Sequence, residues 1–383
     1  MALFSSNFSL YADLSNRVIQ TLRELIESPT RPRIEVYSID EAFVDLQGFP
    51  SSNYRELAYS LKSEVFRRTG IPVSIGIAPS KTLAKAATYF AKRNQEHLYL
   101  IQSEEQRVDA LSSLPVEAVW GVGQKWTERL KRFDLDTALD LAQASPKRLR
   151  AAVNHINLKR LACELRGERC IPLESSPPPR ASIQYSRTFA KPIRYTKDLL
   201  DAIGAFATEL GRRLRTHQRR TGTLLLWLST SLPRGGKSSS RSARPLTYTL
   251  KLSGSIPTYT DDTSSLIRLA QTLCTALVSQ AEAEASPHLK RPIPWRKAGL
   301  LALDLRDETQ LELNLVQPNS KLRHLSQLED ELNRRFGRGV ARVGGLPNRR
   351  SSSGSFSPSW QSKHSALSPR YTTSWADLPV VKA

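Results

Sequence analysis

The sequence predicts an α+β protein of several domains, and three observations support this fold class. Its 383 residues exceed the roughly 100–200 residues of a typical single domain. Hydrophobic residues make up 39% of the chain, with 6 Trp, 11 Tyr and 11 Phe, which is enough apolar material for real cores. Amphipathic helical segments also alternate with short runs rich in Ile, Val, Tyr and Phe.

The first domain is expected over residues 1–113, where strand and helix patterns alternate. Leucines and valines at helical spacing predict the first helix, and Ser80 is a good N-cap for the last one. The expected order is helix 8–27, strands 34–40 and 41–46, helix 54–69, strand 73–78 and helix 81–93.

Residues 114–172 have a different pattern, because short helical segments interrupted by glycines replace the strands. A proline-rich linker is expected over 173–182, followed by a second α+β unit over 183–305. That unit combines strands at 223–229, 246–252 and 298–305 with helices at 196–216 and 264–284. The tail, 306–383, contains one predicted helix at 321–336, and we expect residues 344–366 to be flexible.

Composition excludes several protein classes. The longest purely apolar run, Leu224 to Leu228, is far shorter than the roughly 20 residues of a membrane span, and no signal-peptide pattern is visible. The three cysteines form no CxxC pair, so neither a disulfide framework nor structural zinc is expected. We therefore expect a reduced, cytoplasmic protein with no membrane partner.

Positive charge is concentrated in two windows. Residues 183–253 hold 14 basic and 3 acidic side chains, and residues 334–383 hold 9 basic and 1 acidic, out of a net charge of +20. Such a concentration is typical of proteins that bind a polyanion such as nucleic acid. A merely solubilising surface is the simpler alternative, and a lipid surface is disfavoured because no basic amphipathic helix accompanies the charge.

Two adjacent carboxylates, Asp40 and Glu41, fall where two predicted buried strands meet. Buried neighbouring acids repel one another unless a cation compensates them, and Mg²⁺ binds one or two carboxylates together with substrate phosphates. A solvated acidic turn is the alternative. The next segment places Lys81, Lys85 and Lys92 on one helical stripe, which would suit a triphosphate, although a solvated lysine face would look the same.

Gly121 and Gly123 lie one residue apart before a helical stretch. Such glycines allow backbone N–H groups at a helix N-terminus to hold a phosphate, as in a helix-hairpin-helix DNA-backbone binder. A tight turn in any helical domain would give a similar pattern.

Five motifs in order, SIDEAF, GIAPSKTLAK, VWGVG, CELRGERC and SRTF, resemble those of the Y-family translesion DNA polymerases. The ending SPRYTTSWADLPVV is similar to that of the bacterial UmuC type, which acts in SOS mutagenesis after DNA damage. The resemblance implies a right-hand architecture: palm (1–113), helix-hairpin-helix thumb (114–172), linker (173–182), little finger (183–305) and UmuC-type tail (306–383). It also implies nucleotidyl transfer with two Mg²⁺ ions, a primer-template DNA and a deoxynucleoside triphosphate.

The resemblance assigns roles to individual residues. Asp40 and Glu41 match the metal-binding catalytic pair, and Lys92 matches a lysine that contacts the triphosphate. The DNA contacts implied by the motifs are Gly121, Gly123, Lys125 and Arg187. Leu313 and Leu315 fall where the family has a sliding-clamp motif, and a UmuD-like accessory subunit is a further implied partner.

The sequence departs from the family pattern at two points. Its first residues resemble the segment just after the fingers, so we expect the first metal-binding aspartate, the steric gate and most of the fingers to be missing. Val316 replaces the aromatic anchor of the clamp motif. Two alternatives to an active polymerase therefore stay open: a catalytically dead DNA-binding remnant, and a protein that docks to the clamp or replisome.

Overall fold

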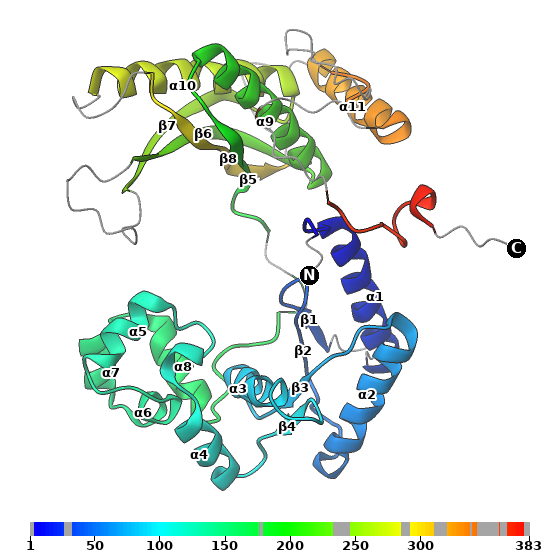
Figure 1. Cartoon of the computed structure of the whole chain (residues 1–383), viewed down its shortest axis with the longest axis vertical. Helices are drawn as coiled ribbons and strands as arrows, with labels where there is room; N and C mark the ends of the chain where they lie inside the picture. Colours follow the sequence, from blue (N-terminus) through cyan, green and yellow to red (C-terminus); the bar gives the residue numbers. More distant parts are fainter. Residues whose placement is uncertain are drawn as a thin grey trace, which may run out of the picture. The chain divides into compact units, whose positions relative to one another are not determined.

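The computed structural model describes residues 4–26, 33–174, 176, 179–232, 246–284, 292–309, 320–337, 339–342, 360 and 366–378 (Figure 1). The chain divides into two compact units. Unit 1 consists of Met1–Pro177 together with Ala366–Ala383, and unit 2 consists of Pro178–Ser365. In the described part of the chain, no helix is long and apolar enough to cross a membrane.

Unit 1 begins with a mixed α/β region. The predicted first helix, strand pair, second helix and Ser80-capped helix are all present, although the strands are only three residues long. The elements are α1 (Phe8–Ile26), β1 (Ile34–Val36), β2 (Ala42–Val44), α2 (Tyr54–Thr69), β3 (Ile75–Ile77), α3 (Lys81–Ala91), β4 (Leu98–Leu100) and α4 (Glu104–Ser113).

Two small sheets make up the β structure described in unit 1. Strands β1 and β2 form an antiparallel hairpin in which Glu35 is opposite Phe43. Strand β3 pairs in parallel with β4, and α3 connects them. Strand β4 was not predicted, because three residues are too few for an alternating pattern to be recognised. Helix α3 begins after Ser80, whose hydroxyl accepts a hydrogen bond from Leu83 N–H at 3.3 Å.

The remainder of unit 1 is helical, as the pattern over residues 114–172 predicted. Buried leucines from successive helices form a shared core that also includes Leu83 of α3. Local signals set the boundaries: Thr137 and Asp140 form a capping box, and Ser145 caps a helix that begins with Pro146. The helices are α5 (Gln124–Lys131), α6 (Ala138–Gln143), α7 (Pro146–Ala152) and α8 (Ile156–Leu165).

Unit 2 is built on one four-stranded antiparallel sheet in the order β5-β8-β6-β7. Its predicted strands and helices are confirmed, but β5 was missed because its polar and basic residues interrupt any regular alternation. The elements are β5 (Ile183–Ile193), α9 (Thr196–Thr216), β6 (Arg219–Leu232), β7 (Leu246–Thr260), α10 (Thr263–Glu284), β8 (Trp295–Asp307) and α11 (Ser320–Phe336).

Helices α9 and α10 lie side by side on one face of this sheet (Figure 1). Leu224, Leu226 and Leu228 of β6 point into the core between sheet and helices and are fully buried. Side chains on the opposite face of the sheet include Trp227, with Gly299 beside it on β8. A Cβ at Gly299 would lie 2.5 Å from the Trp227 ring, so only glycine lets this ring lie flat on the sheet.

The end of the chain returns to unit 1. Ser5 and Leu367 form a parallel bridge, and Ser5 N–H donates to Ala366 C=O at 2.7 Å. Asn7, which is buried, donates from Nδ2 to Ser368 C=O at 3.0 Å. The expected tail therefore contributes α11 to unit 2 and residues 366–378 to unit 1. The proposed clamp residues Leu313 and Leu315, and most of residues 344–366, lie outside the described residues.

Candidate functional site

Asp40 and Glu41 lie in the turn that joins β1 to β2. The turn is closed by the backbone N–H groups of Tyr37 and Ser38, which both donate to Glu41 C=O at 3.0 Å. The Asp40 side chain is exposed, and the Glu41 side chain is partly buried. Both acids therefore lie between the two strands, as expected, but the expected buried setting is wrong for Asp40, because the strands end at Val36 and start again at Ala42.

The Asp40 carboxylate is stabilised in its charged form. A hydrogen bond from Ser38 Oγ to Asp40 Oδ1, 2.5 Å long, is the main reason that its pKa lies below the ordinary value. Burial acts in the opposite direction, and the positive charges of Lys92 and Lys85 add smaller effects that lower the pKa. Asp40 therefore offers an exposed, ionised carboxylate as a potential metal ligand at neutral pH.

Glu41 already has a cationic partner. Lys85 Nζ lies 2.6 Å from Glu41 Oε1, and both side chains are largely shielded from solvent. The ammonium group, which comes from the middle of α3, also lies 5.6 Å from the centre of the Tyr37 ring. From the sequence, a metal ion was expected to compensate the negative charge of the two acids. At Glu41, Lys85 compensates this charge instead.

Lys81 is engaged in a different interaction, which corrects the expectation of a continuous cationic stripe. Its ammonium group lies 2.5 Å from Glu35 Oε2 and donates to Pro172 C=O at 2.6 Å. Glu35 is buried and also accepts a hydrogen bond from Glu174 N–H at 2.6 Å. Lys81 thus ties β1 to the segment that follows α8, and it is not presented to a substrate.

Lys92 lies just beyond α3, as the residue that caps its C-terminus, and its side chain is exposed. Together with Lys85 it provides the positive charge that acts on Asp40. The structure therefore brings Asp40, Glu41, Lys85 and Lys92 into one electrostatic neighbourhood and leaves Lys81 out of it.

An aromatic cluster supports this neighbourhood. Tyr37, Phe43 and Trp120 lie in mutual contact with ring centroids 5.5–5.6 Å apart, and Trp120 Nε1–H donates to the Tyr37 hydroxyl at 3.0 Å. The cluster joins the hairpin to the residue just before Gly121. This cluster was not predicted, although Phe43 belongs to the SIDEAF motif and Trp120 to the VWGVG motif.

The Gly121–Gly123 segment forms a helix start, as predicted. Gly121 has φ +87°, a conformation that favours glycine, and Gly123 is the N-cap of α5. No side chain of the N-cap residue closes this end of the helix, and a Cβ at Gly123 would meet nothing within 4 Å. Lys125 is exposed in the first turn. A phosphate could therefore approach this helix terminus.

Arg187 is exposed on β5 in unit 2. Its Nε–H donates to the Tyr185 hydroxyl at 3.1 Å, and its guanidinium lies 4.8 Å from the centre of the Tyr185 ring. Arg213 of α9 lies 5.0 Å from the same ring centre. Arg187 is thus held on an edge strand of the sheet by an aromatic neighbour.

The hairpin turn offers two carboxylates to a divalent metal. Asp40 offers an exposed carboxylate, and Glu41 offers a second once Lys85 moves aside. Within the described residues, the only group of three or more potential ligands is Cys163, Glu168 and Cys170, so no third protein ligand accompanies Asp40 and Glu41. Two carboxylates fit a Mg²⁺ ion that takes its other ligands from substrate phosphates and water.

Three family models match the chain. The impB/mucB/samB family matches residues 1–89, and the C-terminal domain of the same family matches residues 180–315. A domain of unknown function matches residues 323–381.

Curated proteins match over almost the whole chain. Protein SamB of Salmonella typhimurium is 32% identical over 99% of this chain and 83% of its own length. Protein UmuC of Salmonella typhimurium strain LT2 is 32% identical over 99% of this chain and 84% of its own length. DNA polymerase IV of Francisella philomiragia is 34% identical over 38% of this chain and 40% of its own length.

Among solved structures, a chimeric Y-family DNA polymerase, Dbh-Dpo4-Dbh, superimposes with a TM-score of 0.58. It is 19% identical, and the match covers 79% of this chain and 78% of the chimera. This similarity shows the fold, which is that of the right-hand Y-family polymerases predicted from the motifs. With the family models and the nearly full-length identity to UmuC and SamB, it shows that the chain belongs to the impB/mucB/samB family of UmuC-like Y-family proteins.

Proposed function

We propose that this chain takes part in DNA repair as a UmuC-like translesion polymerase, which adds nucleotides to a primer opposite damaged template DNA. One observation carries the proposal. The exposed Asp40 carboxylate, kept ionised by Ser38, lies in a turn flanked by Lys85 and Lys92, in a chain that belongs to the UmuC-like family. An acid beside lysines suits a metal-bound triphosphate, because the metal bridges phosphates and the lysines neutralise them.

Individual roles follow from the contacts. Asp40 would bind a divalent metal, with Mg²⁺ as the expected ion, and Glu41 would join it after separating from Lys85. Lys85, once released, and Lys92 would then be free to hold the phosphates of a deoxynucleoside triphosphate. The metal, when bound, would supply charge neutralisation at the transferring phosphoryl group. The Tyr37–Trp120 hydrogen bond would fix the orientation of the turn.

The proposed DNA interface has one part in each unit. In unit 1, Gly121, Gly123 and Lys125 would contact phosphates at the start of α5. In unit 2, the sheet face opposite α9 and α10 carries exposed Lys297, whose ammonium lies 5.2 Å from the Trp227 ring centre, and exposed Lys251, which is opposite Trp227 in the β6–β7 register. Arg187 on β5 would add a contact at the sheet edge. Such a charged, sequence-indifferent surface suits a phosphate backbone.

Primer extension past an abasic site tests the catalytic part of the proposal. With Mg²⁺ and with the first metal-binding strand and fingers of a relative added in trans, the wild-type chain should extend the primer, and Asp40→Ala should reduce extension to background. Asp109→Ala, an exposed aspartate on α4, is the matched control and should leave extension unchanged. Lys92→Ala should raise the KM for the nucleotide, whereas Arg93→Ala, whose guanidinium is held against Tyr89, should not.

A second candidate is a chain that binds DNA without extending it. The observation in its favour is that, within the described residues, Asp40 and Glu41 have no third ligand, and Glu41 is paired with Lys85. Extension by the wild-type chain no faster than by Asp40→Ala, with DNA binding intact, would support this candidate and contradict the polymerase proposal.

DNA binding itself has a separate test. The logarithm of the affinity should fall linearly with the logarithm of the salt concentration, and the slope should become shallower in a Lys251→Ala/Lys297→Ala variant. Arg268→Ala, an exposed arginine on α10 at the other side of the sheet, is the matched control. A flat salt dependence in the wild-type chain would contradict the proposed interface. The sliding clamp and a UmuD-like subunit stay predictions, to be tested by pull-down with purified partners.

A further inference from the structure

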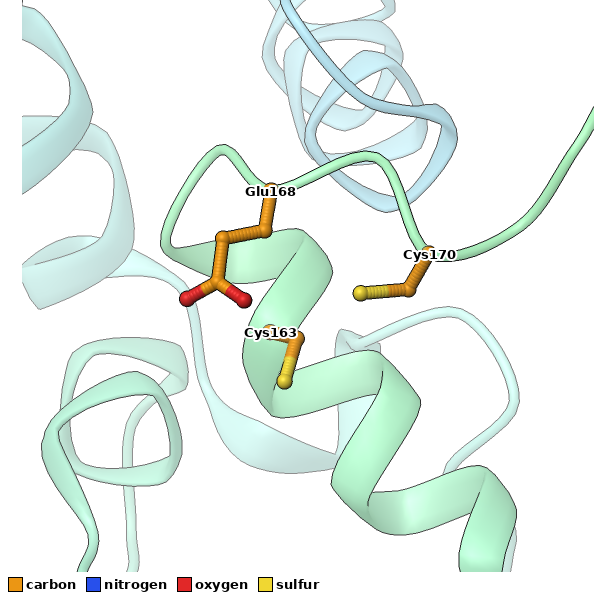
Figure 2. A group of neighbouring side chains, drawn as sticks. All are labelled: Cys163, Glu168 and Cys170. Carbon is orange, nitrogen blue, oxygen red and sulfur yellow. The ribbon is translucent and has the colours of Figure 1, made fainter.

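A compact group of sulfur and oxygen donors lies at the end of α8, apart from the residues proposed for polymerisation. Cys163, Glu168 and Cys170 each offer one potential ligand atom, and these three atoms lie within 4.8 Å of one another. Figure 2 shows Cys163 on the last turn of α8, with Glu168 and Cys170 on the segment that folds back over it. Both cysteines are partly buried, and Glu168 is exposed, so the group is open to solvent on one side.

The backbone holds this arrangement in place without help from any ligand. Gly167 has φ +93°, which reverses the chain direction, and Glu168 N–H then donates to Cys163 C=O at 3.2 Å. Cys170 N–H donates to the fully buried carboxylate of Glu164 at 2.7 Å. Because the three side chains belong to one short, hydrogen-bonded segment, little conformational entropy would be lost if they bound a common ligand.

Arg166 lies against two of the three side chains. It donates to Cys163 Sγ at 3.0 Å and to Glu168 Oε1 at 2.9 Å. Two thiolates and a carboxylate would carry three negative charges, so the single positive charge of Arg166 would not balance them without a divalent cation.

We propose that Cys163, Glu168 and Cys170 form a binding site for one thiophilic divalent cation of the zinc type, with water as the fourth ligand. Two thiolates and a carboxylate carry three negative charges, which the cation and Arg166 together neutralise. Binding to the two thiols forms two metal–sulfur bonds and releases their two protons to solvent. Thiolate ligands select zinc-type ions over magnesium, so this site and the carboxylates at Asp40 would not compete for one metal.

A cation bound at this site would stabilise the structure of unit 1 and would take no part in nucleotide transfer. Just after Cys170, Pro172 C=O accepts from Lys81, and Glu174 N–H donates to Glu35. A cation that fixes Cys170 to α8 would therefore strengthen the connection from α8 to α3 and β1 within unit 1.

Cobalt titration of the reduced, metal-free full-length chain tests the site directly. One equivalent of Co²⁺ should produce thiolate-to-cobalt charge-transfer absorption, and one equivalent of Zn²⁺ should remove it. Cys163→Ser and Cys170→Ser should each lose this absorption, and Glu168→Gln should weaken binding about tenfold. Cys274→Ser is the matched control, because Cys274 lies buried in unit 2 and burial raises its pKa to about 12.

A second readout distinguishes a metal site from a damaged fold. Zn²⁺ should raise the thermal unfolding temperature of the wild-type chain and of Cys274→Ser, but not of Cys163→Ser or Cys170→Ser. Circular dichroism of the two variants without metal should match the wild type. Absence of charge-transfer absorption in the reduced wild-type chain, or equal absorption in Cys163→Ser, would overturn the proposal. None of these measurements involves DNA, so failure here is separate from failure of the polymerase proposal.

Discussion

The β1–β2 hairpin of unit 1 and the β6–β8 pair of unit 2 show two ways of holding functional side chains. The hairpin has three-residue strands, and its turn carries Asp40 and Glu41. Strands β6 and β8 are 14 and 13 residues long, and two helices cover one face of their sheet. The stability of the hairpin therefore depends on contacts of side chains such as Lys85. The stability of the sheet depends on the hydrogen bonds between its strands and on its apolar core.

This difference suits the two proposed activities. Metal binding at the hairpin would require side chains to rearrange, whereas DNA binding on the sheet would require a fixed surface. A short hairpin with an exposed turn belongs to the less stable end of a protein's structure, where local rearrangement costs little free energy. The proposed exchange of Lys85 for a metal at Glu41 would take place in such a region. A long sheet instead offers a fixed surface for an extended ligand.

Phe206→Ala should be the most destabilising of the proposed substitutions. Phe206 is fully buried on α9, and its ring centre lies 5.2 Å from that of Tyr185 and 5.3 Å from that of Trp360. Removing the ring leaves a cavity and should cost about 3–5 kcal/mol. Denaturant unfolding with hydrogen-exchange labelling of β6 measures the loss. Leu325→Ala, an exposed leucine on α11, is the control, and an equal loss there would contradict the assignment of the core.

Hydrogen exchange in the wild-type chain should separate the two regions. Amides of residues 224–228 should exchange about a hundredfold more slowly than amides of residues 34–44, because opening the long sheet requires unfolding of unit 2. Mass spectrometry of peptic fragments gives both rates in one sample. Equal protection of the two segments would contradict the comparison, since the hairpin would then be as stable as the core.

Much of this contrast could be predicted from the sequence. The bounds of α2 and α9 follow from their periodicity together with Gly70 and the polar residues near His217, because these signals are local. Strands β4 and β5 could not be predicted. The first is too short, and the second depends on pairing with β8, which is more than a hundred residues away in the sequence. The lengths of the two hairpin strands were also overestimated. Strands at 34–40 and 41–46 were predicted because apolar residues continue that far, but only Ile34–Val36 and Ala42–Val44 form pairs.

The partners of the proposed site residues could not be predicted from the sequence. Lys85 and Lys81 look equivalent on a helical wheel, yet each is paired with a different glutamate from the hairpin. Cys163 and Cys170 have no recognised metal-binding spacing, and only the reversal at Gly167 brings them together. Such pairings depend on how separate elements pack, which spacing along the chain does not encode.

Glu164→Gln tests the connection between α8 and α3. The buried Glu164 carboxylate accepts from Thr82 N–H at 3.0 Å, Cys170 N–H at 2.7 Å and Ile171 N–H at 3.0 Å. Glutamine keeps one accepting oxygen, but its NH₂ group cannot accept, so one or two of these bonds would be lost and unit 1 should be destabilised by about 1–3 kcal/mol. Thermal unfolding measures this loss. Glu128→Gln, on the exposed side of α5, should leave stability unchanged and serves as the control.

The smallest effect concerns Glu329 of α11. Burial, as the largest cause, raises the pKa of this carboxyl above its ordinary value of 4.5. The folded state then binds the proton more tightly, so its stability is fully present below pH 4.5 and is partly lost as the pH rises. Glu329→Gln should therefore unfold at a higher temperature than the wild type at pH 7, and the difference should shrink towards pH 4.5. A difference that does not change with pH would contradict this account.

The bridge between Ser5 and Leu367 has a consequence for the order of events during synthesis. Unit 1 includes both the first and the last stretches of the chain, and buried Asn7 finds its partner only at Ser368. At about 5–20 residues per second, the ribosome needs on the order of 10–40 seconds to make residues 178–365 after unit 1 has otherwise emerged. Unit 2 can fold during this interval, whereas unit 1 is completed only after Leu367 and Ser368 have been made.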